Sequence, residues 1–325
     1  MALVSIIVLL SFFCGLSFVL NATVIFVVLS KSSIDARETI LMSLAVCDGL
    51  QSIIGFPNEI YGYVNKDNPF KSESLCKTSG FVVMCLAITA ISHLVSLCIY
   101  RYAAIVYPME TQVFVTSPIK VTLYLVLPNW IYGLFWSITP FLGWNEIVRE
   151  KQDTYRCSIN LYPNDQIKQS YLYALTIFCY FLPLSIIIYC IIKVHLELRC
   201  MLKLGKQISG ADASITKATY KLEKEHFISV FLIVVSFFTV WTPYFICVCF
   251  LVYGRSLPSG FLTYCALFAK SSTIINPIVY CIVYKEFRQT AISKVRKLLR
   301  RPAVAPMLVS QLSTAAAPTL ALSGL

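Results

Sequence analysis

The sequence predicts an all-α fold, a seven-transmembrane helix bundle followed by a short amphipathic cytoplasmic helix. Of its residues, 58% are hydrophobic and only 13% are charged, and the mean hydropathy is +0.73. Soluble domains carry about 25% charged residues, so this composition indicates an integral membrane protein. Dividing the chain at its charges leaves seven apolar windows of the roughly 20 residues that a spanning helix needs: 1–30, 39–65, 78–100, 121–145, 169–192, 227–254 and 256–284.

Only three charged residues lie inside these windows. They are Asp48 and Glu59 in the second window and Lys270 in the seventh. Such residues are expensive within a membrane and usually mark functional sites. Glu59 follows Asp48 by eleven residues, which at about 100° per residue gives nearly the same helix face, unless Pro57 rotates that face.

The distribution of basic residues predicts the orientation of the bundle. The formal charge of +11 is concentrated in residues 193–224 and 285–301. Cytoplasmic segments carry the excess of lysine and arginine, so both are expected in the cytoplasm. The window 1–30 lacks the basic start and short core of a cleaved signal, so we expect a retained helix. Seven spans then place the N-terminus outside and the C-terminus inside, in a multi-pass protein of the plasma membrane.

After the seventh window we expect a short helix and a tail. Residues 284–299 combine basic side chains with apolar ones, which suits an amphipathic helix on the lipids of the inner leaflet; a basic segment without a helix is the alternative. Residues 301–325, rich in Ala, Pro, Ser and Thr, are expected to form a disordered cytoplasmic tail. The membrane domain then covers residues 1–300.

Lys270 is the most isolated charge in the seven windows. The nearest charged residues, Arg255 and Lys285, are each 15 residues away, about 22 Å along a helix, so its ammonium group cannot reach either membrane surface. Burial favours the neutral amine, the form that a Schiff-base nucleophile requires. We interpret Lys270 as a functional residue; a structural lysine bound to a carbonyl group or a buried acid is the alternative.

Two of the thirteen cysteines differ from the rest. Most lie in the apolar windows, where cysteine behaves as a small hydrophobic residue. Cys76 precedes the third window and Cys157 lies in the long loop after the fourth, both on the expected outer side, where disulfides can form. We predict an extracellular disulfide between them; two free thiols are the alternative.

Several motifs resemble those of rhodopsin-class G-protein-coupled receptors over residues 1–300. They are Asn21, Leu44-Ala45-Val46-Cys47-Asp48, the cysteines Cys76 and Cys157, Tyr100-Arg101-Tyr102, Trp130, Pro183, Trp241-Thr242-Pro243-Tyr244 and Asn276-Pro277-Ile278-Val279-Tyr280. Lys270, six residues before Asn276 in Phe268-Ala269-Lys270-Ser271-Ser272, resembles the retinal-attachment lysine of opsins. The resemblance implies retinal, 11-cis in the dark, bound covalently to Lys270 and isomerised by light.

Further residues suit a chromophore pocket and a two-state bundle. Trp241 and Tyr244 are three residues apart and share a helix face, and with Tyr180 they are candidate retinal contacts. Proline inside a spanning helix frees a backbone carbonyl that a neighbouring polar side chain can bind. By this reasoning and by resemblance, the candidate switch residues are Asp48, Asn276, Pro277 and Tyr280.

A protonated Schiff base in an apolar pocket needs a negative partner. This chain has Ser79 and Lys151 at the two positions where other opsins carry a glutamate counterion. We hypothesise that Glu59, the remaining acid on the outer half of the bundle, is the counterion or part of it. Chloride bound near Ser79 is the main alternative, and Glu150 or Asp153 is a weaker one. The absence of the usual counterions resembles an anthozoan-specific group of opsins.

The cytoplasmic end departs from the family pattern at Tyr100. This residue replaces the acid that normally precedes Arg101, so the local ion pair cannot form, although Glu223 is available across the bundle. We therefore predict measurable signalling in the dark. Arg101 is expected to meet the C-terminal helix of a heterotrimeric G protein.

Three functions from different classes are compatible with these residues. The first is a signalling opsin, with a heterotrimeric G protein and arrestin as partners. The second is a retinal photoisomerase, against which the intact Arg101 and Tyr280 favour signalling. The third is a receptor for a diffusible ligand, or a transporter, but the sequence shows no inverted repeat. We expect no enzyme activity and no metal site. We also expect no nucleic-acid partner, because the basic charge lies at the membrane's inner face.

Overall fold

The computed structural model describes residues 2–65, 72–115, 117–150, 156–209, 214–258, 260–283 and 285–299. Asp153, Lys151 and the expected tail at 301–325 lie outside these ranges. Within them, seven helical segments are long and apolar enough to cross a membrane: Leu3–Leu29, Ala36–Val64, Glu73–Val106, Ile119–Leu142, Gln166–Gly205, Glu223–Val252 and Phe261–Ile282. The predicted seven-helix fold class is confirmed.

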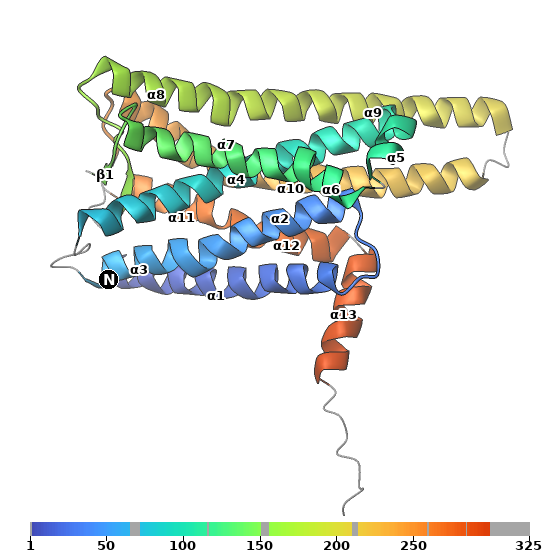
Figure 1. Cartoon of the computed structure of the whole chain (residues 1–325), viewed down its shortest axis with the longest axis horizontal. Helices are drawn as coiled ribbons and strands as arrows, with labels where there is room; N and C mark the ends of the chain where they lie inside the picture. The colour runs from blue at the N-terminus through green and yellow to red at the C-terminus, as the bar shows by residue number, and fades with distance from the viewer. Residues whose placement is uncertain are drawn as a thin grey trace, which may run out of the picture.

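The seven segments lie side by side along the long axis of the molecule (Figure 1). Their helices are α1 (Ala2–Leu29), α2 (Ala36–Leu50), η1 (Gln51–Gly55), α3 (Phe56–Val64), α4 (Glu73–Val106), α6 (Pro118–Val121), η2 (Thr122–Val126), α7 (Leu127–Ile138), η3 (Thr139–Leu142), α8 (Gln166–Thr176), η4 (Ile177–Phe181), α9 (Leu182–Ser209), α10 (Ser214–Val252), α11 (Phe261–Lys270) and α12 (Ser272–Val283). Two further helices, α5 (Pro108–Val115) and α13 (Lys285–Leu299), complete the set. Figure 1 shows α13 turning away from the bundle after α12.

Helices extend beyond several of the apolar windows. The third was expected over 78–100, but α4 runs from Glu73 to Val106. Its first turn is fixed by Ser72, whose hydroxyl accepts from the backbone N–H of Leu75 at 3.1 Å, an N-cap of the usual kind. An ion pair between Lys77 and Glu73 at 2.6 Å follows on the next turn. Charge limits the part of a helix that can enter lipid, but it does not end the helix.

The second span changes its geometry on the way to Glu59. A π-helical turn, η1, separates α2 from α3, and Pro57 stands at the start of α3. A π turn is wider than an α turn, so the 100° spacing between Asp48 and Glu59 does not hold across it. The change in helix geometry therefore lies at η1, just before Pro57, and both acids are buried.

A small β-hairpin, which the sequence did not indicate, covers one end of the bundle. Strand β1 (Ile147–Arg149) pairs antiparallel with β2 (Cys157–Ile159), with Ile147 opposite Ile159. It lies against α4 at Gly80, where a Cβ atom would stand 2.6 Å from Cγ2 of Ile147 and 3.1 Å from the carbonyl oxygen of Cys157. Only glycine lets the hairpin approach the helix this closely.

The core of the bundle is apolar along most of its length. Its largest cluster joins α1, α2, α4, α9, α10 and α12 through residues such as Leu44, Leu94, Ile187 and Ile233. Many large apolar side chains on the outer faces are exposed, including Phe12, Ile131 and Phe250. Apolar side chains on the outer faces are what a surface in contact with lipid requires.

Candidate functional site

Lys270 and Glu59 form a buried ion pair between the seventh and second spans. Nζ of Lys270 lies 3.2 Å from Oε1 of Glu59, and each residue is only 7% exposed. Lys270 ends α11 and Glu59 lies in the first turn of α3. A buried charge is stable only when it is paired, and this pair supplies a partner to each residue. The structure thus brings together the lysine and the acid that the sequence singled out.

The backbone around Lys270 is interrupted, which sets where its side chain points. Helix α11 stops at Lys270 and α12 begins at Ser272. Side-chain hydroxyls bind the carbonyl groups at this junction: Ser271 donates to Phe268 at 2.6 Å, and Thr273 donates to Lys270 at 3.0 Å. Hydroxyl side chains can hold such a break inside a membrane because they satisfy the freed carbonyl groups.

Arg156 is a candidate site residue that the sequence analysis missed. Its Nε lies 2.9 Å from Oε1 of Glu59, and its Nη2 lies 3.2 Å from Oε1 of Glu150. Arg156 and Glu150 are 7% and 5% exposed. One signal could have found Arg156: it directly precedes Cys157, so the predicted disulfide already placed this cation at the same end of the bundle as Glu59.

The four charges balance one another. Lys270 and Arg156 are cations, and Glu59 and Glu150 are carboxylates, so the buried group is neutral as a whole. Burial disfavours the charge of Arg156, but attraction by Glu150 and Glu59 outweighs it and raises the pKa of the guanidinium above its ordinary value. Glu150, considered earlier as a direct partner of the lysine, reaches the site by way of Arg156.

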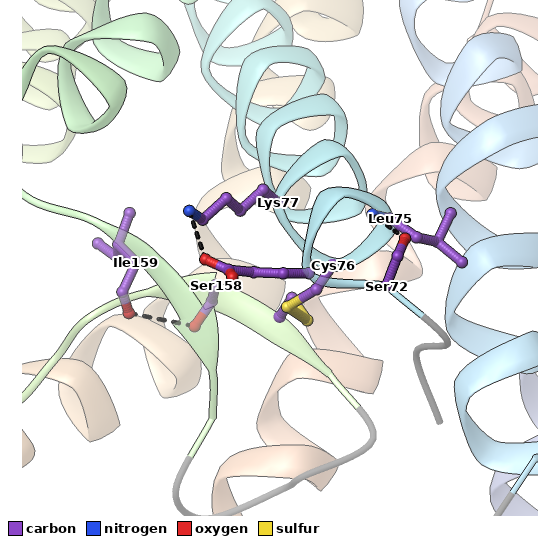
Figure 2. Close-up of a disulfide and its surroundings, with 8 residues drawn as sticks. Ser72, Leu75, Cys76, Lys77, Ser158 and Ile159 are labelled. Carbon is purple, nitrogen blue, oxygen red and sulfur yellow. Dashed lines mark hydrogen bonds and ion pairs between the residues drawn. A yellow bond between two sulfur atoms is a disulfide. The ribbon is translucent and has the colours of Figure 1, made fainter. Parts of the chain in front are cut away.

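A disulfide holds the hairpin in place. Cys76 on α4 and Cys157 on β2 are bonded, with their Cα atoms 5.5 Å apart and 81 residues between them in sequence. Figure 2 shows the sulfur atoms joining the helix to the strand. Next to it, the backbone N–H of Glu150 donates to the carbonyl oxygen of Arg156 at 2.9 Å. Both ends of the Glu150–Arg156 pair are therefore fixed relative to α4.

Aromatic residues of α10 border the charged group. Tyr244 and the guanidinium of Arg156 interact electrostatically. Its ring packs edge-on against Trp241, with the centroids 6.1 Å apart, and Trp241 donates from Nε1 to the hydroxyl of Ser272 at 3.2 Å. Trp241 and Tyr244 thus form one wall that runs from the charged group toward the centre of the bundle.

Tyr180 and Ser79 have different surroundings. The Tyr180 hydroxyl lies 2.9 Å from Oγ1 of Thr242, and its ring stacks on Phe245 with the centroids 3.6 Å apart, so it joins η4 to α10. Ser79 is buried on α4, next in sequence to Gly80. The acid in contact with Lys270 is Glu59, on another helix.

The candidate switch residues meet in the middle of the bundle. Nδ2 of Asn276 donates to Oδ2 of Asp48 at 2.9 Å. Asn21 on α1 donates from Nδ2 to the carbonyl oxygen of Thr273 at 2.9 Å. Pro277 lies inside α12, and Tyr280 is buried one turn further on. A polar path thus runs from the junction below Lys270 to Asp48.

At the end nearer α13, Arg101 has a partner on the sixth span. Its Nη1 lies 3.9 Å from Oε2 of Glu223, and its Cζ lies 5.7 Å from the centroid of the Tyr100 ring. An ion pair at this distance, with Glu223 27% exposed, is weak. The ring of Tyr100 packs beside Arg101. An acid at this position would instead form an ion pair with Arg101.

Comparison with known proteins identifies the relatives of this chain. A family model described as 7 transmembrane receptor (rhodopsin family) matches residues 20–280. Melanopsin-B of Gadus morhua is 29% identical over 277 residues, which cover 81% of this chain and 43% of that protein. Long-wave-sensitive opsin 1 of Bos taurus is 29% identical over 257 residues, covering 77% of this chain and 66% of that protein. This chain therefore spans less than half the length of the melanopsin and about two thirds of the opsin.

Among solved structures, the crystal structure of squid rhodopsin superposes with a TM-score of 0.80 at 20% identity, covering 92% of this chain and 87% of that one. At this identity the match shows the seven-helix fold. The family model and the curated relatives confirm the resemblance to opsins that the motifs indicated. The anthozoan attribution stays a prediction.

Proposed function

This chain belongs to the rhodopsin family of seven-transmembrane receptors, and from that premise we propose that it is a light-sensing receptor that binds retinal through a Schiff base at Lys270. The contact between Lys270 and Glu59 at 3.2 Å carries the proposal. A buried amine beside a buried carboxylate is the arrangement that forming and then protonating a Schiff base requires. The relatives named opsin or melanopsin support the same function.

The residues around Lys270 fit this chromophore. Retinal, when bound, would supply the absorption of visible light and a change of shape on isomerisation. Glu59 would hold the proton on the nitrogen of Lys270 as the counterion. Trp241 and Tyr244 provide rigid aromatic surfaces for an apolar polyene, and the hairpin with its disulfide closes the site from water. The 11-cis isomer is the dark form in this proposal, and chloride at Ser79 is the rival to Glu59.

Signalling would use the opposite end of the bundle. Trp241 is linked to Ser272, one turn before Asn276 and its contact with Asp48, so a change at the site can bias the polar path that ends at Asp48. The bundle would lie in the plasma membrane with its N-terminus outside, which places Arg101 and α13 in the cytoplasm. There a heterotrimeric G protein would dock, followed by arrestin.

The first experiment is spectroscopic. The purified protein is incubated with 11-cis-retinal, its absorption is recorded before and after light, and it is then denatured with acid. We expect a light-sensitive band that acid converts to a protonated retinal Schiff base. The band should be absent in Lys270→Ala and unchanged in Lys77→Ala, a matched lysine whose side chain is 42% exposed on α4.

A second arm separates signalling from isomerisation alone. Cells that express the protein and have been supplied with retinal are assayed for a light-dependent change in second-messenger concentration. Cells that express Arg101→Ala are the comparison. A pigment that forms normally but never signals would support a photoisomerase instead. Failure of a well-folded protein to form any retinal adduct would remove the opsin function and leave a receptor for another ligand.

A further inference from the structure

One oxygen atom of Glu59 is shared by two cations. Oε1 lies 3.2 Å from Nζ of Lys270 and 2.9 Å from Nε of Arg156. Attraction to one cation polarises the carboxylate away from the other, and the two like charges repel each other at short range. Arg156 thus competes with Lys270 for the charge of Glu59.

Glu150 acts on the same competition from the far side of Arg156. Its Oε1 lies 3.2 Å from Nη2 of Arg156. The charges therefore alternate in sign along the series Lys270, Glu59, Arg156, Glu150. Glu150 draws the guanidinium charge toward itself and leaves more of Glu59 to Lys270. All four residues are at most 7% exposed, so solvent screens these effects little.

We propose that the pair of Arg156 and Glu150 is a positioning element that sets the strength of the counterion. Arg156 weakens the hold of Glu59 on a proton at the nitrogen of Lys270, and Glu150 partly restores it. This inference rests on the proposed Schiff base at Lys270. It goes beyond it by assigning opposing roles to two residues of the loop that follows the fourth span.

Arg156 and Glu150 can set the strength of the counterion because their positions are fixed. The backbone bond from Glu150 to Arg156 at 2.9 Å, the register pair of Arg149 with Cys157, and the disulfide to Cys76 hold the two residues against α4. Two tyrosines, Tyr244 on α10 and Tyr63 on α3, also act on Arg156. A phenol ordinarily ionises only near pH 10, so the four charges dominate the site.

The test compares Arg156→Gln, Glu150→Gln and the double variant as reconstituted pigments of the full chain. We expect Arg156→Gln to move the alkaline loss of the visible band to higher pH and the band itself to shorter wavelength, because Glu59 then serves Lys270 alone. Glu150→Gln should do the opposite, with each titration displaced on the order of one pH unit, a tenfold change in the protonation equilibrium. In the Arg156→Gln background, Glu150→Gln should lower that pH little or not at all.

A readout without retinal guards against variants that reconstitute poorly. Formaldehyde with cyanoborohydride methylates neutral amines, and mass spectrometry compares Lys270 with the exposed Lys77 in the same sample. Methylation of Lys270 should be slower in Arg156→Gln and faster in Glu150→Gln. Lys168→Gln, which breaks the 3.1 Å pair with Glu146 in the same region, is the matched control and should change neither readout.

The outcomes are distinct. Changes in opposite directions for the two single variants support the proposal, since a purely structural clamp would be weakened by either change. Shifts in the same direction, or lowered thermal stability with an unmoved titration, would overturn it. If the wild-type protein forms no pigment, the proposed function fails and this inference with it; a normal wild-type pigment with unmoved variants overturns this inference alone.

Discussion

Nζ of Lys270 lies 3.2 Å from Oε1 of Glu59, although the two residues belong to the last and the second spans of the bundle. Each is buried to the same extent, so neither can exchange its partner for water. Removing one member of a buried ion pair typically costs about 3–5 kcal/mol, because the other charge is left buried without its partner.

Glu59→Gln should shift the absorption of the reconstituted pigment from the visible to the near-ultraviolet at neutral pH, because the protonated Schiff base loses its negative partner. Glu59→Asp, which keeps the charge, should retain a visible band. The measurement is a spectrum recorded across pH. Glu73→Gln, at an acid 79% exposed on α4, is the control.

The same spectra distinguish the chloride alternative. Exchanging chloride for sulfate should leave the wild-type band in place if Glu59 is the counterion. A band that moves with the anion and ignores Glu59→Gln would assign the role to chloride.

Gly133→Ala should destabilise the packing of α7 on α4. A Cβ atom at this position would stand 1.9 Å from Oγ1 of Thr89 and 2.8 Å from the carbonyl oxygen of Cys85. We expect a loss of about 1–3 kcal/mol, measured as a lower thermal midpoint in detergent. Adding Thr89→Ala should recover only part of it, because the Cys85 carbonyl belongs to the backbone.

Gly15→Ala is the matched control for this prediction. A Cβ atom there would have no neighbour within 4 Å, so the substitution should be neutral or slightly stabilising, as expected for alanine in a helix. Equal losses for Gly15→Ala and Gly133→Ala would argue against close packing as the cause.

Tyr100→Glu should lower signalling in the dark. It places an acid beside Arg101, whose contact with Glu223 at 3.9 Å is weak, and so strengthens the hold on the resting arrangement. Glu223→Gln should have the opposite effect. The measurement is the basal second-messenger level at equal surface expression. Tyr253→Phe, at an exposed tyrosine directly after α10, should behave as wild type. An unchanged basal level in Tyr100→Glu would contradict the prediction.

The contacts of Glu146 predict that the free energy of unfolding depends slightly on pH. Asn160 donates to its Oε1 at 2.8 Å and Lys168 lies 3.1 Å from its Oε2, and these contacts lower the pKa of Glu146 below its ordinary value. The stabilisation is therefore complete above the carboxyl group's unfolded value of about 4.3 and is lost as pH falls through the lower folded value. Since the side chain is 41% exposed, we expect less than about 1 kcal/mol.

The measurement is the difference in thermal midpoint between wild type and Glu146→Gln at pH 7 and at pH 3. The difference should be present at pH 7 and shrink at pH 3. The exposed Glu110→Gln on α5 is the comparison, and a difference that grows in acid would have the wrong sign.

Much of the architecture could be predicted from the sequence because a lipid environment constrains composition directly. Backbone polar groups in a membrane must be bonded within a helix or a closed barrel, and apolar windows of more than 20 residues fit spanning helices rather than the shorter strands of a barrel. Lys270 stood out for the same reason, as a charge with no route to either surface. The ends of α4 and α9 could not be predicted this way, because helices continue into water where charge is permitted.

The hairpin and Arg156 needed the tertiary structure. Three-residue strands such as β1 and β2 are too short for a periodic signal, and they exist because the disulfide and Gly80 hold them against α4. Arg156 looked like an ordinary loop cation, since its partners come from the second span and from the other side of the hairpin.

By itself, the sequence determined the membrane class, the seven spans and the isolation of Lys270 as a charge inside a span, because each follows from the cost of placing charge and unbonded backbone in lipid. Only the tertiary structure decided which acid reaches Lys270 and what else that acid binds. Spacing along a helix could not predict it, because η1 rotates the face that carries Glu59, and contacts between Lys270, Glu59 and Arg156 depend on how distant segments pack together.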